Sequence, residues 1–173
     1  MISLRPLARP DLLVLGRWLA APHVREWWRE DGLTPADVER DYGPQIDGAD
    51  TACTFVIEAD AAPVGIIQCY RHADTPDWDR AIAVPSAAGL DYLIGMPEFC
   101  GRGVGTAAVA GVRPLVFALY PDVKTVVSVP QQDNLASRRV LEKAGFTLVG
   151  ERLLKTGDAS DAGISAIYSY DRP

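Results

Sequence analysis

Apolar and polar residues alternate along several short segments of the chain, which is the pattern of a strand with one buried face. Glycines, prolines and acidic residues separate these segments and mark turns. The segments that we predict as strands are 2–7, 51–58, 64–70, 90–96, 124–129, 146–154 and 162–170. Segment 124–129 is rich in β-branched residues, so we expect it to be a buried strand.

Apolar residues at helical spacing predict two longer helices, 9–20 and 103–120. Pro22 ends the first of them. Pro114 lies inside the second and cannot donate a backbone hydrogen bond to the carbonyl of Ala110. We therefore expect the second helix to kink or to end early at this proline.

Two further helices are marked by their cap residues. Thr34 supplies a hydroxyl cap, a proline follows at the first helical position, and Asp37 stands three residues after the cap. Asn134 caps a helix over 134–144, and Gly145 closes it. Both starts predict helices independently of the apolar pattern.

Two segments show no clear period. Residues 23–33 are polar but carry the adjacent Trp27 and Trp28, and we expect residues 71–86 to form an irregular, acidic loop. The chain shows no repeat and no linker. We therefore predict a single domain over residues 1–173, of mixed α/β class, with a layer of helices on a central sheet.

The charge balance restricts the partners. The chain has 17 Lys and Arg against 23 Asp and Glu, a net charge of −6. Nucleic-acid binding relies on clustered basic residues, so we expect no nucleic-acid partner and favour a cationic ligand. Three aspartates, Asp74, Asp77 and Asp79, surround Trp78. This cluster could form a cation site, but a solvated loop is the more common interpretation of such a cluster.

The three cysteines, Cys53, Cys69 and Cys100, have no C-x-x-C spacing. They predict neither a disulfide framework nor a metal site. The N-terminus has no signal-peptide pattern and no apolar stretch is long enough to span a membrane. We expect a cytoplasmic protein, either a monomer or a homodimer.

A glycine-rich stretch, FCGRGVGT, joins the strand 90–96 to the helix 103–120. A helix N-terminus has free N–H groups and favours an anion, so the stretch suits a phosphate. A Walker A loop needs Gly-Lys-Ser/Thr, which is absent. A dinucleotide site needs an acid at the end of the next strand, but that strand ends in Ser128-Val129-Pro130. A coenzyme A pyrophosphate loop is the third possibility.

CGRGVGT followed by NLASRRVLEKAGF (residues 134–146) resembles the acetyl-CoA-binding core of the GNAT superfamily of N-acetyltransferases. HVREWWREDGLTPADVERDYGP (23–44) and GLDYLIG (89–95) are similar to aminoglycoside 6′-N-acetyltransferases. The resemblance implies a mixed, mostly antiparallel sheet of about seven strands flanked by about four helices. It also implies acetyl-CoA as the cofactor.

The resemblance further implies which residues hold the cofactor. The pantetheine arm would lie beside one strand end, the pyrophosphate would bind the amides of the glycine turn, and an asparagine would contact the arm. By position these residues are Leu93, Ile94 and Gly95, then Arg102, Gly103, Val104, Gly105 and Thr106, and Asn134. Each also has an ordinary structural role, since Asn134 is a good helix cap and Ile94 a common strand residue.

Asp91 is the candidate catalytic base. An alkylammonium with a pKa near 10 is only about 0.1% neutral at pH 7, so acetyl transfer requires a group that removes its proton. Asp91 is the one acid in an apolar strand, and the resemblance aligns it with an aspartate that binds and activates the amine. The alternative is an aspartate that faces solvent at a strand start.

At the position where many GNAT enzymes carry a tyrosine that protonates the leaving thiolate, this chain has Leu141. We therefore expect water or Tyr92 to take that part. A thiol with a pKa near 8.5 is a tolerable leaving group, so the loss of such an acid costs at most about 10²–10⁴ in rate.

Carboxylates beside aromatic faces suit a small polycationic amine, such as an aminoglycoside. The candidate substrate-binding residues are Trp27, Trp28, Asp77, Trp78, Asp91 and Asp158. The tryptophans could instead pack the N-terminal helices. Val129 departs from the resemblance, because the similar resistance enzymes have an aspartate there that helps to bind the drug.

Two other functions remain open at this point. The chain could acylate another small amine or a hydroxylamine, as in siderophore assembly, whose enzymes also carry a histidine and tryptophans in the first interhelical segment. Alternatively, it could be a non-catalytic acyl-CoA-binding module, which Leu141 would suit.

Overall fold

The computed structural model describes residues 1–30, 33–154, 156 and 158–173. Within them, seven strands form one sheet in the order β1-β2-β3-β4-β5-β7-β6. The strands are β1 (Ile2–Pro6), β2 (Cys53–Ala59), β3 (Ala62–Arg71), β4 (Ala87–Ile94), β5 (Thr125–Ser128), β6 (Thr147–Leu153) and β7 (Ile164–Asp171). The expected mixed α/β class with a seven-stranded sheet is confirmed.

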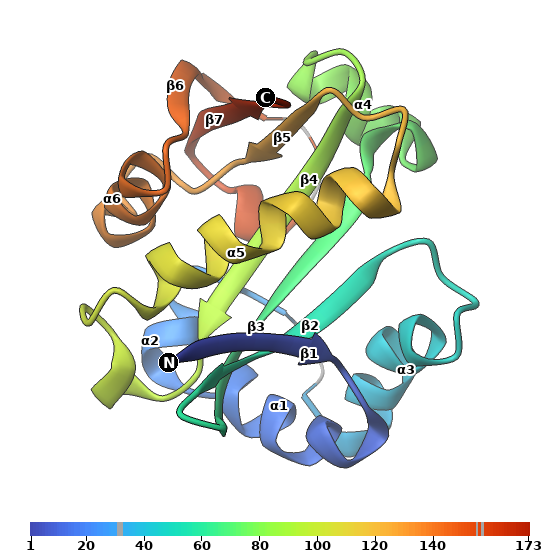
Figure 1. The fold of residues 1–173 in the computed structure, drawn as a ribbon, viewed down its shortest axis with the longest axis vertical. Helices are drawn as coiled ribbons and strands as arrows, with labels where there is room; N and C mark the ends of the chain where they lie inside the picture. Colours follow the sequence, from blue (N-terminus) through green and yellow to red (C-terminus); the bar gives the residue numbers. More distant parts are fainter. Residues whose placement is uncertain (31–32, 155, 157) are drawn as a thin grey trace.

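The sheet is split between its two parallel strands. β4 and β5 pair only over Ala87, Ala88 and Gly89, whereas the other neighbouring strands are antiparallel. Beyond Gly89 the two strands diverge, and Figure 1 shows the gap between β4 and the β5–β7–β6 group. Over the described residues, one edge of β4 therefore has no neighbouring strand from Leu90 onward.

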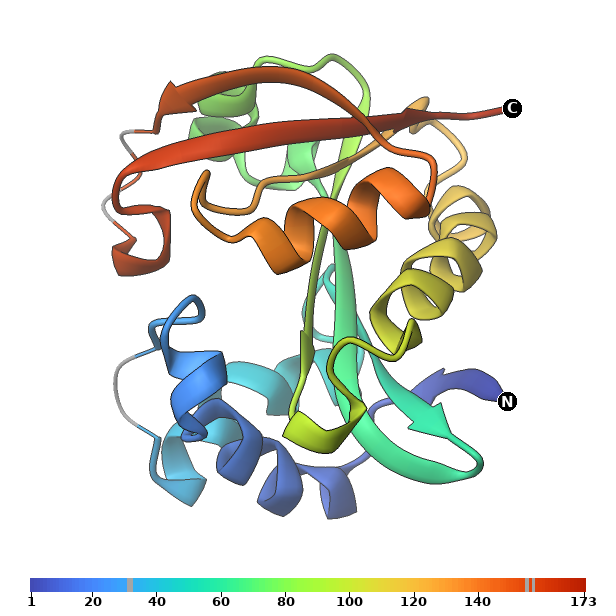
Figure 2. The same cartoon turned by 90° about the vertical axis from the view of Figure 1, so that its left-hand side faces the viewer.

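Six α-helices cover the sheet over the described residues. Figure 2 shows α5 and α6 on one side of the sheet and the N-terminal helices on the other. The helices are α1 (Leu12–Leu19), α2 (Pro22–Arg25), α3 (Pro35–Ile46), α4 (Pro76–Ile82), α5 (Val104–Leu119) and α6 (Leu135–Lys143).

The side chains of β4 alternate between these two layers. Ala88 and Leu90 pack in the large core under α5 and α6. On the opposite face, Leu93 packs with α1 and α3, while Ala87 packs with Ile82 of α4. Two separate apolar clusters thus cover the ends of that face, and the middle of it, around Gly89 and Asp91, is left between them.

Two segments expected to be irregular contain short helices. α2 lies in the tryptophan segment, whose residues 31–32 lie outside the described residues, and α4 lies in the acidic segment. Each helix has a proline at its first turn, where no N–H is needed. These two helices raise the number from the expected four to six.

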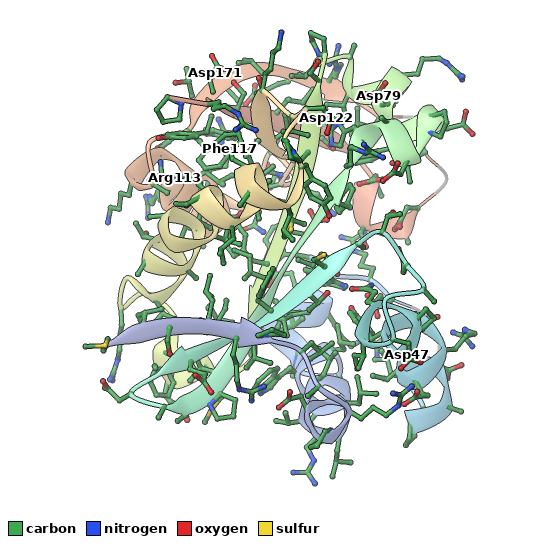
Figure 3. All side chains as sticks on the ribbon, turned by 45° about the vertical axis from the view of Figure 1, so that its right-hand side comes forward. Asp47, Asp79, Arg113, Phe117, Asp122 and Asp171 are labelled. Carbon is green, nitrogen blue, oxygen red and sulfur yellow. The ribbon has the colours of Figure 1, made fainter. Side chains whose placement is uncertain are left out.

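An early end of the helix at Pro114, one of the two effects expected, does not occur: α5 continues to Leu119. The carbonyl of Ala110, which Pro114 leaves without its usual donor, accepts a hydrogen bond from Nε of Arg113 at 3.3 Å. A side chain thus replaces the missing backbone donor. Figure 3 shows Arg113 and Phe117 on α5, with Asp171 on β7 beside it.

The expected caps are confirmed. Thr34 and Asp37 form a capping box at the start of α3, and the side chain of Asn134 accepts a hydrogen bond from the N–H of Ser137 at 3.1 Å. Gly145 has a φ of 87°, which suits the residue after a helix end. Among the described residues, no helix is both long and apolar enough to cross a bilayer.

Candidate active site

A cavity of about 1130 Å³ opens on the face of the sheet between the two apolar clusters. Its floor is formed by β3 and β4, where Gln68 lies opposite Asp91 and Tyr70 lies opposite Gly89. Its walls come from the segments before α3, around α4, after β5 and before β7. The cavity therefore gathers residues from the whole length of the chain.

Asp91 lies on the floor of this cavity. Burial raises the pKa of its carboxyl to about 6, the Tyr70 hydroxyl opposes this rise, and the charges of Asp161 and Asp158 add to it. A carboxylate with a pKa near 6 is a stronger base than an ordinary aspartate and is still charged at pH 7. The role of Asp91 as the base stays a prediction; its side chain is half-buried and lies within β4, not at the start of the strand.

An acidic wall, formed by Asp158 and Asp161, lines the cavity from the segment between β6 and β7. Asp158 accepts a hydrogen bond from the N–H of Ser160 at 2.7 Å, and Asp161 accepts one from the hydroxyl of Thr156. Burial and the neighbouring Asp158 raise the pKa of Asp161. Asp158 was expected here, whereas nothing in the local sequence marked Asp161.

The aromatic wall contains both adjacent tryptophans. Trp27 and Trp28 line the cavity, and Trp28 also packs against the α1–α3 core. The indole N–H of Trp28 and the hydroxyl of Tyr42 both donate to one oxygen of Glu30. Glu30, which the sequence did not indicate, thus joins the tryptophan segment to α3 and adds a carboxylate to the cavity.

The third wall is formed by α4. Trp78 lines the cavity and packs on its other side against the cluster around Ile82. Asp77 also lines the cavity, but its side chain is 98% exposed and pairs with Arg80. Asp77 is therefore at the rim, where water screens its charge. Asp74 pairs with Arg71 instead and does not line the cavity.

One contact joins two walls of the cavity that are far apart in sequence. The backbone N–H of Arg29 donates to Oγ of Ser160 at 3.0 Å, and the side-chain amide of Gln131 donates to the Ser160 carbonyl at 2.6 Å. Ser160 therefore holds the tryptophan segment, the end of β5 and the acidic wall together. No sequence motif marked this residue.

Backbone groups of β4 point to its open edge. The N–H of Gly95 donates to Val64 of β3 at 2.8 Å, so the alternate residues Ile94 and Tyr92 direct their N–H and C=O groups to the opposite, open edge. Nε2 of His23 donates to the carbonyl of Ile94 at 2.9 Å from that side. Of the three expected strand residues, Ile94 presents its backbone to the gap, while Leu93 and Gly95 pair with β3.

The glycine turn lies at the N-terminus of α5, on the gap side of β4. Gly101 and Gly103 have φ values of 71° and 81°, which other residues rarely adopt. Among the described residues, no acceptor bonds the N–H groups of residues 101–106, and the first bond of this helix joins Ala107 to Gly103. Six free amides at the start of a 16-residue helix fit an anionic diphosphate.

Two hydroxyl groups lie between this turn and α6. The hydroxyl of Tyr92 is 2.7 Å from Oγ of Ser137, and burial raises the pKa of Tyr92. Leu141 occupies the position at which similar enzymes carry a tyrosine. Its side chain is fully buried in the core under α5, so α6 offers no acid there. Asn134 lines the cavity and caps α6 with its side-chain oxygen.

The wall at the end of β5 is apolar. Val129 lines the cavity and packs against the cluster around Ile82, so an apolar side chain stands where the similar enzymes have an aspartate. Ser128 beside it is buried and supplies a hydroxyl. The end of β5 therefore adds no carboxylate to those that Asp91 and the acidic wall supply.

The fold and this site define a class of acyltransferase domain. The family described as "Acetyltransferase (GNAT) domain" matches residues 8–154. The chain therefore belongs to the GNAT family of acetyltransferases.

Particular members of the family are similar over most of the chain. An aminoglycoside N(6′)-acetyltransferase type 1 of Klebsiella pneumoniae is 30% identical over 161 residues, covering 91% of this chain and 80% of that protein. A lysine N-acyltransferase, MbtK, of a Mycobacterium species is 30% identical over 151 residues, covering 86% of this chain and 61% of that protein. The crystal structure of aminoglycoside acetyltransferase AAC(6′)-Ib with coenzyme A and kanamycin superposes with a TM-score of 0.84 at 28% identity, covering 99% and 95% of the two chains.

Proposed function

We propose that this protein is a cytoplasmic N-acetyltransferase that uses acetyl-CoA to acetylate the 6′-amino group of an aminoglycoside. One observation carries the proposal: a half-buried carboxylate with a raised pKa, Asp91, lies in a cavity lined by acids and tryptophans, on the strand that has an open edge. Relatives that are named or crystallised as aminoglycoside 6′-acetyltransferases support the choice of acceptor.

The cofactor fits the free backbone groups of this chain. The amides of residues 101–106 suit its diphosphate. The N–H and C=O of Tyr92 and the N–H of Ile94, which point to the open edge of β4, suit the amides of its pantetheine arm, while the Ile94 carbonyl is already bonded to His23. Asn134 lies beside that gap. When bound, acetyl-CoA supplies an acetyl group that is activated as a thioester.

The residues of the chain then act on the acceptor. The acidic wall and Asp91 attract the ammonium groups of a polycation, and the faces of Trp27, Trp28 and Trp78 offer cation–π contacts. Asp91 accepts a proton from the reacting ammonium, directly or through a water, and so produces the neutral amine.

A panel of amines, with acetyl-CoA and thiol release as the signal, tests the proposal. Kanamycin should be acetylated, while a matched aminoglycoside with a hydroxyl at the 6′ position should not. Asp91→Asn should lower kcat/KM by about 10²–10⁴ and leave the Kd for coenzyme A unchanged. Turnover of polyamines or peptides but not of kanamycin would reject the aminoglycoside assignment.

Antibiotic resistance is the physiological part of the proposal. Expression of the chain in a susceptible bacterium should raise the inhibitory concentration of kanamycin, and expression of Asp91→Asn at the same level should not. Equal inhibition of both strains would mean that resistance is not a consequence of this activity.

A second acceptor is favoured by Val129. This apolar residue lies where an acid would bind a further ammonium group, and a lysine N-acyltransferase is as similar in identity as the aminoglycoside enzyme. An acceptor with one amine, such as lysine or its N6-hydroxyl derivative, needs fewer carboxylates than an aminoglycoside. Faster turnover of these amines than of kanamycin would favour this alternative.

A further inference from the structure

Tyr70 lies on β3, the strand next to β4, which carries Asp91. Tyr70 of β3 is paired with Gly89 of β4, so both residues face the cavity. A Cβ built on Gly89 would lie 2.3 Å from Cζ of Tyr70 and 2.6 Å from its hydroxyl oxygen. The phenol therefore occupies the space that any other side chain at position 89 would fill.

This placement brings the phenol hydroxyl to Asp91. Side chains two residues apart on a strand share a face and lie about 7 Å apart. Asp91 is the next residue after Gly89 on this face, and the Tyr70 hydroxyl already lies above Gly89. In this structure the phenol hydroxyl and the Asp91 carboxylate are neighbours on one face of the sheet that form no hydrogen bond with each other, and the hydroxyl lowers the pKa of Asp91 against the effect of burial.

Two aromatic residues hold the phenol in this position. The ring of His72 is fully buried and stacks on Tyr70 with 5.9 Å between centroids and 26° between planes. Trp78 contacts His72 edge-on at 82°. Neither ring nitrogen of His72 has a hydrogen-bond partner among the described residues, so the imidazole acts by packing, and a buried polar ring without partners is costly.

We propose that Tyr70 is a positioning residue that donates a hydrogen bond to the Asp91 carboxylate in the working enzyme, and that Gly89 is needed to make room for it. The inference rests on the proposed role of Asp91 as the base. Without Tyr70, a buried carboxylate with no fixed donor would ionise less readily and would be free to rotate away from the acceptor.

Other groups also act on the ionisation of Asp91. Asp158 and Asp161 face it from the acidic wall and raise its pKa, while Tyr42 of α3 and Tyr92 of β4, both of which have raised pKa values, stay neutral near pH 7. A variant of Tyr70 leaves all four groups in place. A change in the titration of Asp91 in that variant can then be assigned to the phenol hydroxyl.

The first test titrates Asp91 in the free protein by carboxyl-carbon NMR, with the signal assigned from Asp91→Asn. Tyr70→Phe keeps the ring and removes the hydroxyl, so the midpoint of Asp91 should rise by about one pH unit. Tyr120→Phe, which removes a phenol hydroxyl bonded to the Thr51 carbonyl on the far side of the sheet, is the matched control and should not shift it. An unchanged midpoint in Tyr70→Phe overturns the proposal.

The second test follows kcat/KM against pH with one acceptor. For a midpoint that moves from about 6 to about 7, Tyr70→Phe should lose about fivefold at pH 6 and less than about 1.5-fold at pH 8. A uniform loss at all pH values would show a structural role and reject the proposal. Because the NMR titration needs no acceptor, it still decides on Tyr70 if no aminoglycoside is acetylated.

Gly89→Ala tests the part assigned to the glycine. Its methyl group displaces the phenol, so the NMR midpoint of Asp91 should rise as in Tyr70→Phe, and the double variant Tyr70→Phe/Gly89→Ala should rise no further. Additive shifts would mean that the glycine acts on Asp91 by another route. If Gly89→Ala does not fold, Tyr70→Phe remains the deciding variant.

Discussion

Burial acts in opposite directions on two ionisable residues of the cavity region. It raises the pKa of Asp91 to about 6 and lowers that of His72 to about 4, because in each case the neutral form is favoured. His72 is thereby kept neutral at pH 7, as a stacking residue must be. Asp91 stays charged at pH 7, against its surroundings, and this tension has a measurable cost in stability.

Asp91→Asn should stabilise the protein at neutral pH. The carboxyl has a higher pKa folded than its usual 3.8 unfolded, so the folded state binds more protons between pH 4 and 6 and loses stability as pH rises through that range. Above pH 6 the full cost, up to about 3 kcal/mol, is present. Thermal melts at pH 8 should show a higher Tm for the variant, and melts at pH 4 should not.

The outcome that would contradict this prediction is a lower Tm for Asp91→Asn at pH 8. It would mean that the charged carboxylate makes net favourable contacts in the folded protein. Asp77→Asn is the matched control, because the side chain of Asp77 is almost fully exposed and should change the Tm little at either pH.

At the scale of single residues, the sequence indicated those that are unusual in their own segment. Asp91 is the acid of an apolar strand, and Trp27 and Trp28 are aromatic residues in a polar segment. Asp161 and Tyr70 resemble their neighbours in sequence and become distinctive only when the fold sets them beside Asp91. The positions of such residues depend on contacts that no local pattern encodes.

At the scale of elements, the start of α5 combines a backbone requirement with the proposed cofactor site. Gly103 has a φ of 81°, while no atom lies within 4 Å of the Cβ that it lacks. The glycine is therefore required by the path of the backbone, not by a close contact. That path leaves the amides of residues 101–106 without acceptors.

Gly103→Ala should weaken both the fold and cofactor binding. A left-handed alanine costs about 1 kcal/mol, and relief of this strain would turn the amides away from the diphosphate. Urea unfolding should show the loss of stability, and calorimetry should show a higher Kd for coenzyme A. Gly150→Ala is the control, since Gly150 has neither a positive φ nor a neighbour within 4 Å. Unchanged affinity in Gly103→Ala would argue against this turn as the diphosphate site.

The sequence predicted elements best where the signal is chemical. The caps at Thr34, Asn134 and Gly145 lie where the structure places them, because each satisfies local backbone groups. The helices α2 and α4 were missed because four and seven residues are too few for a helical period. The continuation of α5 through Pro114 depends on Arg113, whose side chain the periodicity does not describe.

At the scale of the whole molecule, the end of the chain secures the end of its longest helix. Arg172, which follows β7, donates from Nη2 to the carbonyls of Phe117, Tyr120 and Val123. Its guanidinium also lies 4.6 Å from the centroid of the Phe117 ring. Residues near the C-terminus thus supply the positive charge that a helix C-terminus favours.

Arg172→Ala should lower the free energy of unfolding by about 1–2 kcal/mol, since several carbonyls lose a charged donor at once. The midpoint of urea unfolding measures this change. Arg139→Ala, at an exposed arginine of α6 with no hydrogen bond or ion pair to the described residues, should be close to neutral. Equal midpoints for the two variants would mean that the C-terminal arginine does not stabilise α5.

The succession of strands along the chain could be predicted from the sequence pattern, whereas the geometry of the cavity could not. The contact of Arg29 with Ser160 joins residues 131 positions apart, and Asp91 faces acids from a segment that follows it by more than 60 residues. Distances of this kind depend on the twist and splitting of the complete sheet. They could not be obtained from any one stretch of the chain.

The short ladder between β4 and β5 is the point from which the two strands diverge. The two strands share hydrogen bonds only over Ala87, Ala88 and Gly89, and Ile94 lies five residues further on, about 16 Å away at strand spacing. A rotation of about 5° at the ladder would therefore move the tip of β4 by about 1.4 Å, roughly the length of one carbon–carbon bond. A small change in the angle at which the two strands diverge is thus magnified at the open edge of β4, where the cofactor arm is proposed to lie.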